Sequence, residues 1–345
     1  MKTYKKLTPI EHILKRPGMY IGSIDKVIEY MDILEDDKII NKEIEYSSGL
    51  YKIFDEIISN AYDEAIRSSK VQNIKVNIEN NKISIYNDGS SIDIVKHKEY
   101  KVYNPELIFG QLLTSSTFSQ EKRITAGTHG LGAKLTNIFS KKFIVEIGDS
   151  KNKKHYKQVF ENNMKKINKP EIKPYTKNNF VKITFIPDYK KFGFDNLTED
   201  NFKLFKRRTY DLAGIIKNVK VYFNKEKIII NNFVDYIKLY YKDNDINFVY
   251  QKCGDSEFVI SNSKDDKFKQ ISFVNSVYTK YGGKHVDFIM KQFLSNMNKA
   301  IAKKYKKIKI RDSFIKDKIW IFINAVIENP VFSSQSKDSL SSNVK

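Results

Sequence analysis

The fold is decided by the stretch Leu50-Tyr51-Lys52-Ile53-Phe54-Asp55-Glu56-Ile57-Ile58-Ser59-Asn60 and its continuation to Ile66. Apolar residues recur along it at helical spacing and no Gly or Pro interrupts them, which predicts a helix with one buried face. At 100° per residue, Glu56, Asn60 and Asp63 share a narrow polar stripe beside that face. A carboxylate and an amide one turn apart suit a water molecule and a magnesium ion, although a solvated helix edge has the same composition.

A predicted β-hairpin follows this helix. It consists of the alternating runs Ile74–Ile78 and Ile83–Tyr86, separated by four polar residues. Asp88 comes just after the second run and precedes Gly89, so its carboxylate is expected at the mouth of a sheet, where it can accept a hydrogen bond from an adenine amino group. An ordinary Asn-Asp-Gly turn is the alternative interpretation.

A glycine loop, Gly127-Thr128-His129-Gly130-Leu131-Gly132-Ala133-Lys134, leads into a further predicted helix that ends near Phe139. The glycines remove side chains where backbone amides must approach a phosphate, and the N-terminus of the helix favours anions. The loop lacks the Walker spacing, and its place in the chain is not that of a first dinucleotide-binding turn. By itself such a string indicates only a glycine-rich turn.

The composition limits the remaining possibilities. A chain of 345 residues favours two domains. The net charge of +20 favours a polyanionic partner, nucleic acid first, although evenly spread lysines also serve solubility. Cys253 is the only cysteine, which excludes an internal disulfide and a thiolate zinc cluster. The longest apolar run, Ile319–Ile327, is too short to span a bilayer, so we expect a soluble intracellular protein without a membrane partner.

Alternating and helical patterns elsewhere predict helices on a mixed sheet up to residue 230 and a smaller α+β domain over residues 231–345. The first set comprises strands at Val181–Ile186 and Val219–Phe223 and a helix at Phe202–Ile216. The second set comprises strands at Phe258–Ile260, Ile271–Val277 and Trp320–Val326 and an amphipathic helix at Val286–Ile301.

Taken together, Glu-x-x-x-Asn on a helix, an acid and glycine after a strand, and the glycine loop before a helix resemble the Bergerat ATP fold of the GHKL group. Further strings are similar to the N-terminal region of eukaryotic-type DNA topoisomerase II, a type IIA enzyme, and the match runs through nearly the whole chain. They are Glu11–Ser23, Lys52–Ile58, Leu107–Ser116, Phe273–Ser276, Gly282–Asp287 and Ile327–Pro330. The resemblance implies a GHKL ATPase domain at 1–230, with a short N-terminal arm, and a ribosomal-protein-like β-α-β transducer domain at 231–345 that we expect to be incomplete at its C-terminal end.

The resemblance also implies a role for each matching residue. Glu56 would be the general base and Asn60 the magnesium ligand. Asp88 would hold the adenine, Ser115 and Ser116 would contact ribose or phosphate, and Gly127 to Lys134 would wrap the triphosphate of ATP. Gln335 and Lys337 resemble the Q-T-K loop that reaches the γ-phosphate, where a cation stabilises developing charge.

Several positions depart from the family pattern. Ser91 replaces the second glycine of the adenine-side motif, and Val181 stands where relatives often have threonine. Ser336 and Asp338 replace the usual threonine and glutamate of the lysine loop. These changes affect the adenine side and the loop, and they leave the base, the amide and the lysine in place.

The densest basic run is Lys303-Lys304-Tyr305-Lys306-Lys307-Ile308-Lys309-Ile310-Arg311, at the end of the amphipathic helix. We expect it to contact double-stranded DNA through phosphates, although a solvated helix end is the alternative.

The resemblance predicts the N-terminal gate of a type II topoisomerase, a homodimeric clamp that closes on ATP around a DNA segment and serves ATP-dependent strand passage and supercoil relaxation. No cleavage domain follows, so the cleavage core is expected in the same longer polypeptide or in a separate subunit. Two alternatives stay open, a GHKL clamp ATPase of mismatch-repair type and a nucleotide-gated dimerisation module without turnover.

Overall fold

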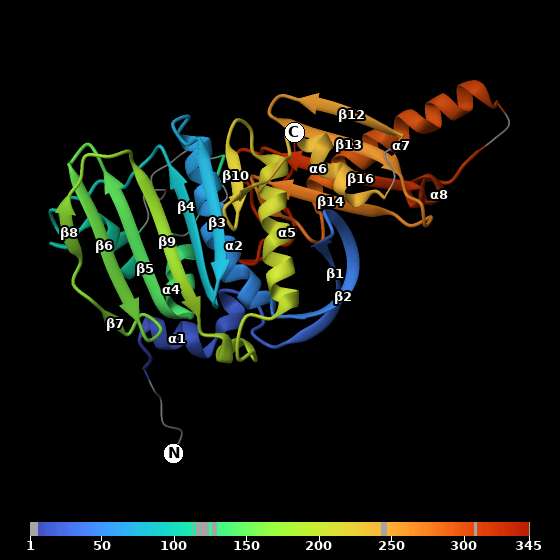
Figure 1. Cartoon of the computed structure of the whole chain (residues 1–345). Helices are drawn as coiled ribbons and strands as arrows, with labels where there is room; N and C mark the ends of the chain where they lie inside the picture. The colour runs from blue at the N-terminus through green and yellow to red at the C-terminus, as the bar shows by residue number, and fades with distance from the viewer. Residues whose placement is uncertain are drawn as a thin grey trace, which may run out of the picture. The chain divides into compact units, whose positions relative to one another are not determined.

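The computed structural model describes residues 6–112, 114, 124–125, 130–242, 247–306 and 309–344. They form two compact units, the first within Met1–Gln120 and Gly127–Asn231 and the second within Glu121–Ala126 and Asn232–Lys345. Each unit has its own sheet with helices packed on it (Figure 1). Within the described part of the chain, no helix combines the length and apolar character needed to cross a membrane.

The first unit is built on a nine-stranded sheet in which β3 and β10 run parallel and the other neighbours antiparallel. The predicted mixed sheet is therefore confirmed. Its order is β11 (Glu226–Lys227), β10 (Lys220–Phe223), β3 (Asn73–Glu79), β4 (Lys82–Asp88), β9 (Phe180–Pro187), β5 (Ser140–Asp149), β6 (Lys154–Glu161) and β7 (Lys166–Ile167), with β8 (Glu171–Pro174) paired to β6.

Helices cover one face of this sheet, and Figure 1 shows α2 (Ser48–Arg67) and α4 (Gly132–Ile138) against it. Strand alternation provides that face, because Ile74, Val76 and Ile78 of β3 are buried while Lys75 and Glu79 are exposed. The other helical elements of this unit are α1 (Pro9–Lys15), η1 (Pro17–Met19), α3 (Asn104–Gly110), η2 (Tyr189–Phe192) and α5 (Glu199–Ile215).

A hairpin of β1 (Val27–Glu35) and β2 (Lys38–Tyr46) was not predicted from the sequence. Asp36 and Asp37 form its two-residue turn, both with positive φ (48° and 57°), a conformation usually taken by Asn or Gly. The hairpin packs on α5, where Leu204 is buried with four of its side chains, Met31, Ile33, Ile44 and Tyr46.

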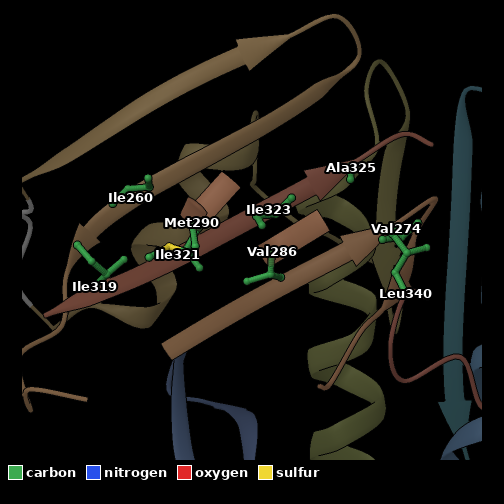
Figure 2. Packing of buried hydrophobic residues seen from close by; sticks show 9 residues of the cluster. All are labelled: Ile260, Val274, Val286, Met290, Ile319, Ile321, Ile323, Ala325 and Leu340. Carbon is green, nitrogen blue, oxygen red and sulfur yellow. The ribbon is translucent and has the colours of Figure 1, made fainter. Parts of the chain in front are cut away.

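The second unit contains a five-stranded sheet with a β-α-β connection. Strands β14 (Lys269–Val274) and β16 (Ile319–Ala325) are parallel neighbours, and α7 (Lys284–Lys304) and α8 (Asp312–Asp317) lie between them in the chain. The sheet order is β12 (Phe248–Cys253), β13 (Ser256–Asn262), β16, β14 and β15 (Val277–Tyr278), and α6 (Phe233–Ile237) and η3 (Lys238–Tyr240) complete the unit. Val286 and Met290 of α7 pack on this sheet (Figure 2).

The strand predicted over Ile271–Val277 is wrong in its second half. Asn275 and Ser276 have positive φ values of 47° and 70° and turn the chain back between β14 and β15. The Asn275 side chain then fixes the neighbouring segment, since it donates to the carbonyl of Ile327 and accepts from its amide, both at 2.8 Å.

A buried polar network lies at the start of α7. His285 is 2% exposed, and its Nε2 atom lies 3.3 Å from Oγ1 of Thr279. Thr279 in turn donates to the carbonyl of Ser272 at 2.9 Å. Burial lowers the pKa of His285 from 6.5 to about 4, because the charged imidazolium would lose its hydration.

This pKa predicts acid sensitivity of the second unit. The folded state keeps His285 neutral down to about pH 4, whereas the unfolded chain takes up a proton below about pH 6.5, so stability is present above pH 6.5 and is lost as the pH falls toward 4. When the pH is lowered from 7 to 4.5, the unfolding free energy should fall in both proteins. We expect this fall to be about 2–3 kcal/mol smaller in His285→Gln than in the unmodified protein. Urea unfolding followed by fluorescence of Trp320, the only tryptophan, reports on this unit. Equal pH dependence of the two proteins would contradict the prediction, and His155→Gln on the first unit serves as control.

Candidate active site

Glu56 is a buried carboxylate on α2. It is 7% exposed, and its Oε1 atom lies 2.9 Å from Nζ of Lys52, one turn earlier on the same helix. Lys52 is itself 5% exposed and lies 3.5 Å from the carboxylate of Asp55. An ion pair at this depth is only weakly screened by solvent, so Lys52 favours the ionised form of Glu56. The sequence interpretation missed Lys52, although its i, i+4 spacing to Glu56 was visible.

The glycine loop approaches this carboxylate at Gly132, the first residue of α4. A Cβ atom built on Gly132 would lie only 2.0 Å from Oε2 of Glu56, so the glycine is what lets the carboxylate sit there. A hydrogen bond fixes α4 to α2, since the hydroxyl of Thr136 donates to the carbonyl of Ile53 at 2.8 Å. The helix with the carboxylate and the loop with the glycines therefore meet at Glu56.

Asn60 stands out by its exposure. Within residues 52–63, all of which the structure describes, it alone is exposed, while Glu56 and Asp63 on the same stripe are buried. Asn60 is therefore accessible to solvent, one turn further along α2 than Glu56. No group of three or more His, Cys, Asp or Glu side chains that could hold a metal occurs among the described residues. A metal at this place would have Asn60 as its ligand and take its remaining ligands from substrate and water.

Asp88 has hydrogen-bond partners that the sequence did not predict. Its Oδ1 atom accepts hydrogen bonds from the backbone amides of Gln72 and Asn73, at 2.8 and 2.9 Å, and Oδ2 accepts from the Asn73 side chain. The carboxylate thus holds the start of β3. Side chains alternate along β4, so Asn87 (6% exposed), not Asp88, shares the helix-covered face with Ile85. The sequence interpretation missed Asn87 because it did not follow this alternation to the strand end.

The Lys134 side chain forms hydrogen bonds with residues 114 and 130. Its ammonium donates to the carbonyls of Thr114 and Gly130, each at 2.6 Å, and to the Thr114 hydroxyl at 2.8 Å. The side chain is 1% exposed, and burial lowers its pKa to about 8. In this structure the ammonium thus bridges residues 114 and 130, while Leu131 and Ala133 lie beside it at the start of α4.

The remaining predicted residues divide into two groups. Ser115, Ser116, Gly127, Thr128, His129 and Lys307 lie outside the described residues. Gln335, half-buried, and Lys337, 7% exposed, belong to the second unit, where Lys303, Lys304, Lys306 and Lys309 are exposed.

Backbone hydrogen bonds tie the segment around Lys337 to the start of α7. Tyr281 donates to the carbonyl of Asp338 at 2.9 Å, Lys284 donates to Leu340 at 3.0 Å, and Leu340 donates to Gly282 at 3.1 Å. Gly283 allows this approach, because a Cβ atom on it would lie 2.3 Å from the Leu340 carbonyl oxygen. The lysine segment and α7 thus form one hydrogen-bonded piece.

Two family models match the chain. One is described as histidine kinase-, DNA gyrase B-, and HSP90-like ATPase and matches residues 45–165, and the other is described as DNA gyrase B and matches residues 214–345. The chain is 42% identical to DNA topoisomerase 2-alpha of Sus scrofa over 355 aligned residues, which cover 100% of this chain and 23% of that protein. It therefore spans about a quarter of the length of such curated relatives.

Solved structures match over nearly the whole chain. The ATPase region of Saccharomyces cerevisiae topoisomerase II has a TM-score of 0.93 and 40% identity, covering 99% of this chain and 91% of that chain. The ATPase and transducer domains of DNA topoisomerase II from Balamuthia mandrillaris have a TM-score of 0.94 and 37% identity, covering 99% and 89%. The fold class predicted from the sequence, a Bergerat-type α+β unit followed by a transducer unit, is confirmed.

Gly89, which follows Asp88, has no room for a side chain. Its φ is +80°, and a Cβ atom on it would lie 1.9 Å from the carbonyl oxygen of Lys70. We expect Gly89→Ala to lower the free energy of unfolding by more than about 2 kcal/mol, because strain and a backbone clash add together. Gly18→Ala, with nothing within 4 Å of the added atom, should change it by less than about 0.5 kcal/mol. Urea unfolding followed by circular dichroism compares them, and equal values would contradict the expectation.

Proposed function

The chain belongs to the family formed by the ATPase regions of type II DNA topoisomerases, and from this membership we propose that it binds and hydrolyses ATP to operate the N-terminal gate of such an enzyme. The observation that carries the proposal is the meeting of Glu56, Lys52 and Gly132, since it gives an oriented carboxylate beside a glycine loop. The 99% coverage by topoisomerase structures favours this reading over a mismatch-repair clamp.

Glu56 is proposed as the general base. An ionised carboxylate can accept a proton from a water molecule as that water attacks the γ-phosphoryl group. Lys52 keeps the acceptor ionised, and its ion pair leaves the second oxygen, Oε2, toward Gly132. The backbone at Gly132 presents no side chain there, which leaves room for the approach of a phosphate.

Magnesium is proposed at Asn60. The exposed amide of this residue beside Glu56 offers a neutral oxygen, and a hard cation accepts it together with phosphate oxygens and water. When bound, the ion would neutralise charge on the phosphates. On the adenine side, we assign to Asn87 the contact first expected of Asp88, because Asn87 lies on the helix-covered face.

Lys337 is proposed to bind the terminal phosphate of ATP. A cation near the transferring phosphoryl group stabilises the charge that develops there, and Gln335 would support it. Two ATP molecules would join two copies of the chain around a DNA segment, and hydrolysis would release them. The chain would act with DNA inside the cell, together with a cleavage core that serves double-strand passage.

The first experiment measures ATP hydrolysis with and without duplex DNA. We expect Glu56→Gln to lower turnover at least about 100-fold, because the acceptor for the proton is removed, while nucleotide-dependent dimerisation is retained. Glu64→Gln, two turns further along α2, is the matched control and should stay near the unmodified rate. An unmodified chain that dimerises with ATP yet never turns it over would instead indicate a gating module without hydrolysis.

The second experiment concerns DNA. Replacement of Lys303, Lys304, Lys306 and Lys309 by Gln should reduce the slope of log Kd against log salt for duplex binding by about 3–4, because four phosphate contacts are lost. Fluorescence anisotropy at several salt concentrations measures this slope. The control replaces four exposed lysines of the first unit, Lys217, Lys220, Lys225 and Lys227. Equal slopes for both variants would assign the effect to net charge rather than to the basic run.

A further inference from the structure

We propose that Arg208 on α5 is a positioning residue for Glu56 and acts on it through Asp55 and Lys52. The inference rests on the proposed function, because it concerns the group that would activate water. Arg208 lies 153 positions from Asp55 in the chain, and it reaches the base only because α5 packs on α2.

The contacts form a continuous series. Nε of Arg208 donates to Oδ1 of Asp55 at 2.7 Å. The other oxygen of Asp55 lies 3.5 Å from Nζ of Lys52, and that ammonium lies 2.9 Å from Glu56. Ser59 supports the series, since its hydroxyl lies 3.4 Å from both Asp55 and Arg208. The alternating charges link α5 to the carboxylate in three steps.

Depth makes this series unusual. Arg208 is 0% exposed, and Lys52, Asp55 and Glu56 are each at most 7% exposed. Apolar side chains of similar volume generally stabilise a core as well as a buried ion pair does, and charged side chains are almost never fully buried unless they are paired. Three such groups that lead to the Glu56 carboxylate beside a glycine loop therefore indicate a role in positioning that carboxylate.

The effect of the series on Glu56 depends on the position of the Lys52 ammonium between Glu56 and Asp55. Its ammonium is shared unequally, 2.9 Å from Glu56 and 3.5 Å from Asp55, because Arg208 already satisfies Asp55. Without the guanidinium, Asp55 would attract Lys52 and draw it from Glu56. The base would then lose its orientation and become easier to protonate. Lys52 is the charged group in contact with Glu56, and Asp55 and Arg208 follow it in the series. Tyr51 of α2 and Arg207 and Asp211 of α5 interact electrostatically with this group of charges.

A helix neighbour supplies a matched control. Arg207 is 1% exposed on the same helix, and its Nε lies 3.1 Å from the carboxylate of Asp211, also on α5. Arg207→Met therefore removes an equally buried guanidinium and leaves a buried carboxylate behind, as Arg208→Met does. It differs in leaving the contact between Arg208 and Asp55 in place.

The experiment measures the rate of ATP turnover from pH 5 to 9. Each rate is divided by the concentration of protein that can bind nucleotide, which is determined by titration with a nonhydrolysable ATP analogue. For Arg208→Met we expect kcat to fall about 10- to 100-fold with KM changed less than about 3-fold, because a displaced base affects the chemical step. The acidic limb of the profile should move to higher pH. Adding Asp55→Asn removes the competing carboxylate, so the double variant should recover kcat to within about 3-fold of the unmodified chain. Arg207→Met should keep the unmodified profile.

Three outcomes would overturn the proposal: an unmodified profile in Arg208→Met, no recovery in the double variant, or the same change in Arg207→Met. If Arg208→Met does not fold, Arg208→Lys takes its place, because it keeps the charge and loses the guanidinium geometry; an unmodified kcat in it would also overturn the proposal. An unmodified chain without ATP turnover would contradict the proposed function itself, which separates the two failures.

Discussion

The buried ion pair between Lys52 and Glu56 is the interaction on which the site in the first unit depends. A buried carboxylate is costly unless it is paired, and Lys52, one turn earlier on α2, supplies a cation at 2.9 Å from Glu56. The cation that pairs with Glu56 therefore comes from α2 itself. The glycine at the start of α4 lies against Glu56, and Arg208 of α5 is linked to Lys52 through Asp55.

Close backbone approach is the second constraint. Gly132 admits the carboxylate, Gly89 admits the carbonyl of Lys70, and Gly283 admits Leu340. In each case the absence of a side chain on the glycine lets a carboxylate or a backbone carbonyl from another segment come close to it. These positions are where the fold has least tolerance, and they flank the residues to which chemistry is assigned. The same glycines thus allow close packing and lie next to the residues proposed to act in the site.

Sequence patterns predicted the long elements well and the short-range geometry poorly. Helices α2 and α7 and the β3–β4 hairpin follow from periodicity because their apolar faces are continuous. The turn at Asn275 was missed because two residues at positive φ carry no glycine. The hydrogen bonds of Asp88 were not predicted, because its three donors belong to Gln72 and Asn73, which are 16 and 15 positions away in the sequence. The pairing of Arg208 with Asp55, far apart in sequence, has no local signature at all.

The hydrogen bonds that join Leu340 to Gly282 and Lys284 attach the start of α7 to the lysine segment, so the two should move together. A helix of 21 residues is about 30 Å long, so a turn of its unit by about 10° about the lysine segment would carry the far end through about 5 Å. Its second half runs past the sheet (Figure 1), and Lys303 and Lys304 are at its tip. A small rotation at the lysine segment is thereby amplified along the helix to the end that carries Lys303 and Lys304.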